Sequence, residues 1–197
     1  LMGIVPRAWA SFPWMDLASA LASFEIHHCE AVKNGTVETS ITHKVWRSID
    51  RAREVHLSSS PVPRHIVIVQ GIEGIGKTSA AKTKCGLHLG EMRFIPLLGN
   101  VNLKDFFRST SRGCGLPHGE NLKAEQMKTN VENFLRVSRL ILVVDEAHRL
   151  FPDGNRVYAA PALMNWIYML SELKAPVVML VTPQFATRMD IVENCTD

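Results

Sequence analysis

Residues 71–78 constrain the fold most strongly, because they read Gly-Ile-Glu-Gly-Ile-Gly-Lys-Thr and complete a G-x-x-x-x-G-K-[ST] motif. The apolar, β-branched run 66–69 precedes the motif, and the residues after it, 79–84, favour a helix. A strand, a glycine turn and a helix are the context in which this motif binds phosphate. The glycines let backbone N–H groups surround phosphate oxygens, and the helix N-terminus adds partial positive charge. The sequence therefore predicts an anion site at the end of a strand.

The residue types in this loop predict how it would hold a nucleotide. Lys77 can reach the β and γ phosphates, and the Thr78 hydroxyl can bind Mg²⁺. The expected nucleotide-binding residues are Gly71, Gly74, Ile75, Gly76, Lys77, Thr78 and Ser79.

From Arg64 onward, predicted strands and helices alternate. The expected strands are 65–70, 92–98, 140–144 and 177–181, with helices between them, one of which spans 157–172. Asn102 and Asn121 are expected to cap two of the helices, and Gly113 is expected to end the first of these. Near-continuous apolar strands divided by helices predict an α/β fold, a parallel sheet sandwiched between helices.

The first 60 residues are expected to form a small helical attachment. One helical pattern runs through 14–24, and a second amphipathic helix begins near Ser40, with Ile41, Val45, Ile49 and Ala52 on its apolar side. Its Lys and Arg residues fit a solvated face or contact with DNA. A linker is predicted at 58–63, which divides the chain into the attachment (1–60) and a P-loop core (61–197).

Polar residues follow the third and fourth predicted strands. Asp145 and Glu146 end strand three, and Thr182 ends strand four. Because parallel strands open at one edge of the sheet, these side chains are expected near the loop. We expect Asp145 to hold Mg²⁺ through water and Glu146 to polarise the attacking water. Thr182 is placed to reach the γ-phosphate or that water, and Gln184 is a second candidate for the same contact. The predicted catalytic residues are thus Lys77, Glu146 and Thr182, and the predicted metal residues are Thr78 and Asp145.

Composition adds few constraints. A net charge of +3 neither favours nor excludes nucleic acid. The four cysteines form no C-x-x-C pair, which gives little support to a zinc site and fits free thiols in a reducing cytoplasm. The longest apolar stretch, 159–181, is interrupted by polar residues, and no membrane span is expected.

These motifs together resemble those of the AAA+ ATPases over residues 64–185. Residues 71–78 are similar to Walker A, residues 140–146 resemble Walker B with its catalytic glutamate, and Thr182 takes the place of the sensor-one residue. Within that superfamily the chain resembles the ATPase subunits of bacterial transposition systems and related phage or mobile-element ATPases. The supporting segments are 74–82, 106–108 with 113–116, 145–150 and 182–185.

The resemblance implies ATP and Mg²⁺ as ligands, assembly into a homo-oligomer, binding to DNA and recruitment of a transposase or similar partner protein. It also implies a fifth strand, an arginine finger and a helical lid after sensor one. Only residues 185–197 follow that point, so we expect a chain truncated before the lid, with the strand at 65–70 on an edge of the sheet.

Two other functions fit parts of the pattern. The Asp-Glu-Ala-His tetrad at 145–148 also marks a helicase family, but that family needs two motor domains and a Ser-Ala-Thr tract, where this chain has Thr182-Pro183-Gln184. A nucleotide-gated signalling or scaffold module with little hydrolysis is the alternative from a different class.

Overall fold

The computed structural model describes residues 37–57, 66–99, 101–151, 160–172 and 175–185. The chain divides into two compact units, Leu1–Val37 and Glu38–Asp197, and every element described below belongs to the second. The helix predicted within 14–24 and the linker predicted at 58–63 lie outside the described residues. In the part of the chain that is described, no helix is both long and apolar enough to cross a membrane.

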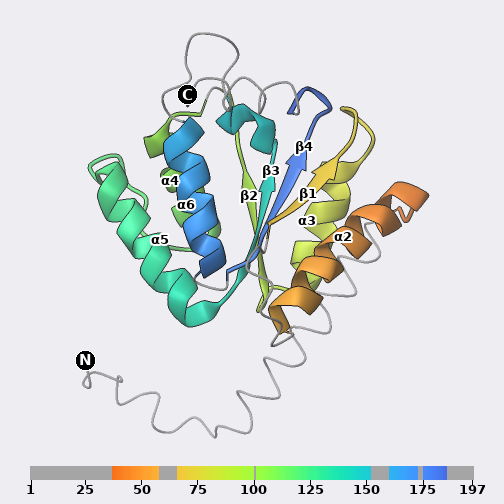
Figure 1. Ribbon diagram of the computed structural model, residues 1–197, viewed down its shortest axis with the longest axis horizontal. Helices are drawn as coiled ribbons and strands as arrows, with labels where there is room; N and C mark the ends of the chain where they lie inside the picture. The colour runs from red at the N-terminus through yellow and green to blue at the C-terminus, as the bar shows by residue number, and fades with distance from the viewer. Residues whose placement is uncertain (1–36, 58–65, 100, 152–159, 173–174, 186–197) are drawn as a thin grey trace, which may run out of the picture. The chain divides into compact units, whose positions relative to one another are not determined.

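Four parallel strands form one sheet in the order β1-β4-β3-β2 (Figure 1). They are β1 (Ile66–Gln70), β2 (Met92–Pro96), β3 (Ile141–Asp145) and β4 (Val177–Val181). In the register, Ile66 lies opposite Val177 and Met92 lies opposite Ile141. The predicted α/β class and parallel sheet are confirmed, and β1 lies at one edge of the described sheet. All four C-terminal strand ends therefore open on one side, where residues after β1 and β3 can meet.

Helices cover both faces of this sheet (Figure 1). On one side lie α2 (Ser40–Leu57) and α3 (Lys77–Leu87). On the other lie α4 (Leu103–Gly113), α5 (Ala124–Ser138) and α6 (Ala160–Glu172), while a short 3₁₀ helix, η2 (Ala147–Leu150), follows β3.

The sheet has two apolar faces because its central strands alternate between two cores. In β3, Ile141 and Val143 pack with α2 and α3, whereas Leu142 and Val144 pack with α4, α5 and α6. Residues of β4 alternate in the same way. Every side chain of β3 and β4 is buried, which explains their continuous hydrophobic sequences.

Helix α2 packs directly on α3, the helix that follows the loop. Its buried residues Val45, Ile49 and Ala52 join the core beneath α3, as their spacing predicts. Ile41, predicted on the same side, is only partly buried. The division of the chain at residue 60 stays a prediction, although α2 lies in the same compact unit as the sheet.

Both predicted ends of α4 were right, whereas three other predicted boundaries were wrong, among them that of β3, which spans Ile141–Asp145 and not 140–144. Asn102 caps α4, since its side-chain oxygen accepts a 2.9 Å hydrogen bond from the Asp105 N–H, and α4 ends at Gly113. The expected cap at Asn121 was wrong, because α5 begins at Ala124 with Lys123 as its N-cap. The Gln126 side chain accepts a hydrogen bond from the Lys123 N–H at 3.0 Å and so fixes the helix start there. Strand β2 ends at Pro96, two residues earlier than predicted.

Candidate nucleotide site

The loop after β1 requires glycine at two positions. Gly74 and Gly76 adopt left-handed backbone conformations, with φ of 74° and 97°. A residue with a Cβ rarely adopts these angles. Gly76 is the N-cap of α3, so its conformation turns the chain from the loop into the helix. The exposed N–H groups of that first turn are suited to an anion.

Lys77 closes the loop from within. Its Nζ donates hydrogen bonds to the carbonyl oxygens of Gly71 at 2.6 Å and Ile72 at 2.8 Å, and the residue is buried. The Gly71 N–H donates to the Val181 carbonyl at 3.1 Å, which ties the loop to the end of β4. A Cβ at Gly71 would lie 3.2 Å from the Lys77 side chain, so a larger residue there would require that side chain to shift.

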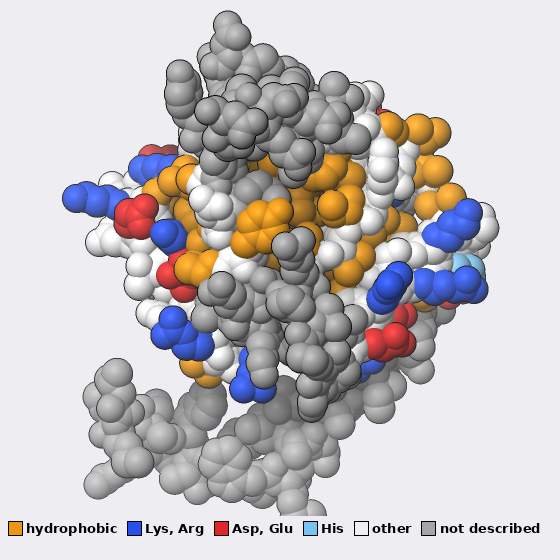
Figure 2. Space-filling model, in the orientation of Figure 1, with side chains coloured by type: hydrophobic (Ala, Val, Ile, Leu, Met, Phe, Trp, Pro, Cys, Tyr) orange, Lys and Arg blue, Asp and Glu red, His pale blue; other side chains and the backbone are white. Residues whose placement is uncertain are grey.

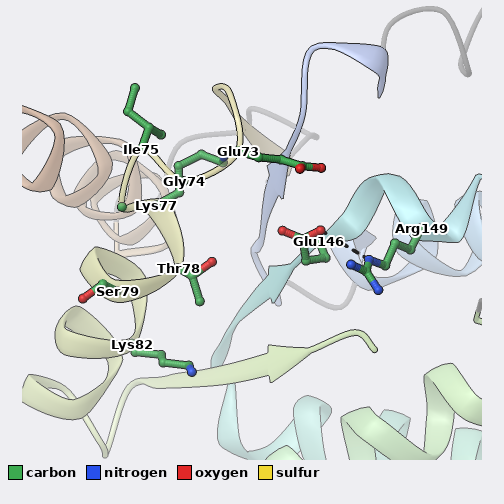
Figure 3. A pocket seen from close by; sticks show the side chains of 10 residues that line it. Glu73, Gly74, Ile75, Lys77, Thr78, Ser79, Lys82, Glu146 and Arg149 are labelled. Atoms are coloured by element: carbon green, nitrogen blue, oxygen red, sulfur yellow. Dashed lines mark hydrogen bonds and ion pairs between the residues drawn. The ribbon is translucent and has the colours of Figure 1, made fainter. Parts of the chain in front are cut away.

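A cavity of about 550 Å³ lies over this loop and extends to the residues after β3 (Figure 3). Its volume is in the range of small-molecule sites. The lining residues are Glu73, Gly74, Ile75, Gly76, Lys77, Thr78, Ser79, Lys82, Glu146 and Arg149. The cavity thus brings together six of the predicted loop residues and the predicted catalytic glutamate. Gly71, Asp145 and Thr182 are not among its lining residues.

Asp145 lies buried beside the loop, at the last position of β3. Burial raises its carboxyl pKa above the ordinary value, and the neighbouring Glu146 acts in the same direction. A hydrogen bond from Thr78 and the charge of Lys82 oppose that rise. Among the described residues, Asp145 Oδ1 has no hydrogen-bond partner. A buried acidic oxygen without a partner, next to a threonine hydroxyl, fits a Mg²⁺ ion, because Mg²⁺ prefers oxygen ligands and would satisfy that atom.

Glu146 follows directly in an unusual backbone conformation. Its φ is 56°, in the left-handed region that a residue with a side chain seldom adopts. Its Oε2 lies 3.3 Å from Arg149 Nε and 3.5 Å from His148 Nε2. Figure 3 shows the Arg149 guanidinium beside Glu146, on the side away from Thr78. The carboxylate therefore lies between the phosphate loop and a cation.

Thr182 and Gln184 differ in their surroundings. Thr182 is buried at the end of β4, and its carbonyl accepts a 3.0 Å hydrogen bond from the Phe185 N–H. Gln184 is exposed. Since neither residue lines the cavity, a contact of either with a γ-phosphate stays a prediction.

Three cavity residues were absent from the predicted set: Glu73, Lys82 and Arg149. Lys82 follows Thr78 by four residues on α3, so the two share a side of that helix. Its Nζ lies 5.5 Å from the centre of the Phe94 ring on β2. That spacing was a usable sequence signal. The position of Arg149 after strand three also places it near the site, but its contact with Glu146 depends on the backbone turn of η2.

The chain is similar to a known protein family and to a solved structure. A model described as "AAA domain" matches residues 62–189. Among solved structures, Cdc6p from Pyrobaculum aerophilum has a similar fold, with a TM-score of 0.50 and 17% sequence identity over 78% of this chain. The chain spans only 44% of that protein's length. No curated protein matches it. Because the family model covers most of the chain, the protein belongs to the AAA domain family and is an AAA+ ATPase in fold.

Proposed function

We propose that this chain binds Mg-ATP and hydrolyses it to ADP and phosphate. The observation that carries the proposal is one cavity lined by the glycine loop, Lys77 and Glu146, with Asp145 buried at its side. A phosphate-binding loop and a carboxylate that can take a proton from water are the two parts that phosphoryl transfer to water requires.

Each group then has a defined role. The N–H groups at the start of α3 and the Lys77 ammonium bind the phosphates. Thr78 and Asp145 would hold Mg²⁺, which supplies charge neutralisation on the phosphate oxygens. Glu146 accepts the proton of the attacking water, and Thr182 is proposed to help orient that water. Only Glu146 takes part in proton transfer, so its loss should affect turnover more than binding.

The test combines turnover with binding. Purified protein is assayed for phosphate release from ATP with Mg²⁺, and nucleotide affinity is measured separately with a fluorescent ATP analogue. Glu146→Gln should lower turnover by about 10²–10⁴-fold and keep binding, whereas Lys77→Ala should weaken binding. Wild-type turnover no greater than that of Glu146→Gln, with duplex DNA present, would refute hydrolysis. That result, with binding retained, would favour the alternative function, a nucleotide-gated scaffold.

We further propose that ATP controls assembly into a homo-oligomer and binding to DNA, in a cytoplasmic transposition or mobile-element system with a transposase or similar partner. The support is the resemblance of the segments 106–108 with 113–116 and 182–185 to those of the ATPases of such systems. On the face drawn in Figure 2, Lys and Arg are interspersed with Asp and Glu around an apolar centre. Simple charge attraction is therefore a poor basis for DNA binding by that face.

Two measurements test this wider proposal. A mobility assay with duplex DNA is run with ATP, with ADP and without nucleotide, and sedimentation is followed under the same conditions. Retarded DNA and a larger species are expected only with ATP. Equal DNA binding in all three conditions would contradict ATP control.

A further inference from the structure

The Glu146 carboxylate is held through its Oε2 oxygen. Both of its side-chain contacts, Arg149 Nε at 3.3 Å and His148 Nε2 at 3.5 Å, are made by Oε2. Among the described residues, the side-chain hydrogen bond to this carboxylate comes from Arg149 Nε and is accepted by Oε2. A carboxylate fixed through one oxygen keeps the other as a proton acceptor. The contacts of Oε2 therefore orient the carboxylate and leave Oε1 available as a proton acceptor.

The backbone reinforces this arrangement. Glu146 is one of two described non-glycine residues with positive φ, and the other, Arg139, ends α5. The Arg149 N–H donates to the Glu146 carbonyl at 2.9 Å, which closes the turn of η2. The same turn brings the Arg149 side chain back over Glu146. Unfavourable backbone angles persist where the surroundings impose them, and they are frequent at active sites.

The Arg149 contact has little value for stability alone. The side chains of Arg149 and Glu146 are 37% and 27% exposed, and ion pairs of this kind add little to the free energy of unfolding. A similar pair exists elsewhere: Arg108 Nη1 lies 3.4 Å from Asp105 Oδ1, also three residues apart, on α4. That pair is not part of the nucleotide cavity. The Arg108–Asp105 pair is therefore a control, because it has the same chemistry as the Arg149–Glu146 pair but lies outside the nucleotide cavity.

We propose that Arg149 is a positioning residue for hydrolysis, which holds Glu146 through Oε2 so that Oε1 is presented to the attacking water. The proposal rests on the ATPase function proposed above and assigns a residue that acts through Glu146. The Arg149 guanidinium lies on the side of the Glu146 carboxylate away from Thr78, as Figure 3 shows. Arg149 can therefore hold Glu146 without touching nucleotide. Without Arg149, Glu146 would rotate among several rotamers, and fewer molecules would have the acceptor oxygen in place at any time.

Kinetics of Arg149→Ala and Arg149→Lys test this role. General-base catalysis is worth about 10²–10⁴ in rate, and loss of positioning should remove part of it. For Arg149→Ala we expect kcat to fall roughly tenfold, with KM for ATP and the measured affinities for ATP and ADP within about twofold of wild type. Arg149→Lys should recover part of kcat, because it keeps a cation but not the planar guanidinium.

A double-mutant cycle separates action through Glu146 from direct action on nucleotide. In a Glu146→Gln background, Arg149→Ala should change the residual turnover by less than about twofold, because the group that it positions is already lost. Arg108→Ala, which breaks the matched pair on α4, should leave kcat unchanged. Thermal unfolding of each variant checks that the fold is retained. If Arg149→Ala fails to fold, the same double-mutant cycle with Glu146→Gln is carried out with Arg149→Lys and Arg149→Gln.

Four results would overturn the proposal. They are an unchanged or raised kcat for Arg149→Ala, an equal loss for Arg108→Ala, a similar loss in the Glu146→Gln background, and a loss confined to ATP affinity. Wild-type protein without turnover would contradict the proposed function as well, whereas active wild type with an equally active Arg149→Ala would contradict the role of Arg149 alone.

Discussion

The indole N–H of Trp46 donates a 2.8 Å hydrogen bond to the carbonyl oxygen of Ala80, in the first turns of the helix that follows the phosphate loop. A second link lies close to it. The Lys84 ammonium is 2.8 Å from Asp50 Oδ1 and lies 5.4 Å from the Trp46 ring centre. Helix α2 thus stabilises α3 on the side away from the cavity through polar as well as apolar contacts.

Loss of the Asp50 carboxylate should destabilise the protein without touching the site. Lys84 is 8% exposed, and Asp50→Ala would leave its charge without the carboxylate partner. We expect the free energy of unfolding to fall by about 1–2 kcal/mol, between the values of exposed and buried pairs. Urea unfolding measures it. Arg47→Ala, at an exposed position of the same helix, is the control and should stay within about 0.5 kcal/mol of wild type.

A methyl group at Gly113 should be costly because α4 meets β2 there. A Cβ would clash with the Ile95 side chain and lie 3.1 Å from the Phe94 carbonyl oxygen. Gly113→Ala is expected to lower the free energy of unfolding by about 1–3 kcal/mol. Gly90→Ala is the matched change, since a Cβ there meets nothing within 4 Å. Equal unfolding midpoints for the two variants would contradict this packing.

Cys85 and Cys114 should resist alkylation in the folded protein. Burial raises the pKa of the Cys85 thiol to about 12 and that of Cys114 to about 11. At pH 8 the thiolate fraction of Cys85 is then on the order of one in ten thousand, and only the thiolate reacts. Iodoacetamide labelling followed by mass spectrometry should show both cysteines protected until denaturant is added.

The same shifts predict loss of stability at alkaline pH. A folded-state pKa above the unfolded value means that the folded state retains the proton longer, so stability falls as pH rises from the unfolded thiol pKa toward the folded one. Unfolding midpoints should decline above about pH 9, and serine at both positions should reduce that decline. An identical decline in the serine variant would assign it to other groups.

Asp145→Asn should raise the stability of the Mg²⁺-free protein and lower its ATPase activity. Because burial raises the pKa of this carboxyl, the folded state favours its protonated form, and its ionisation costs stability as pH rises. Without Mg²⁺, the variant should be more stable than wild type near pH 8, with the difference shrinking toward acid pH. Its Mg²⁺-dependent turnover should fall roughly a hundredfold or more. Thermal melts in chelator and turnover at increasing Mg²⁺ measure the two effects.

The sequence predicts the parts of this fold that depend on local pattern. The central strands were located because β4 is apolar throughout and β3 is apolar up to Asp145, and the glycine loop was located because its residue types permit few other structures. Helix starts were less reliable: Asn121 has a good capping side chain, but the Gln126 contact moves the start to Lys123. Competing local hydrogen bonds of similar strength decide such boundaries.

The site was predictable in its residues but not in its contacts. Asp145 and Glu146 follow from their place at a strand end. The positive φ of Glu146 and its contact with Arg149 do not, because both depend on the 3₁₀ turn after β3. The buried position of Thr182, outside the cavity lining, also could not be read from residue type alone.

The pairing of β1 with β4 has a consequence for how the molecule becomes functional. Ile66 lies opposite Val177, so a long stretch of sequence separates the strand that carries the phosphate loop from its neighbour in the sheet. Such distant pairing makes chain closure slow, and during synthesis β1 must wait for β4 to emerge from the ribosome. Nucleotide binding should therefore require that β4 has been synthesised, and a chain interrupted before β4 would present apolar β1 to other proteins.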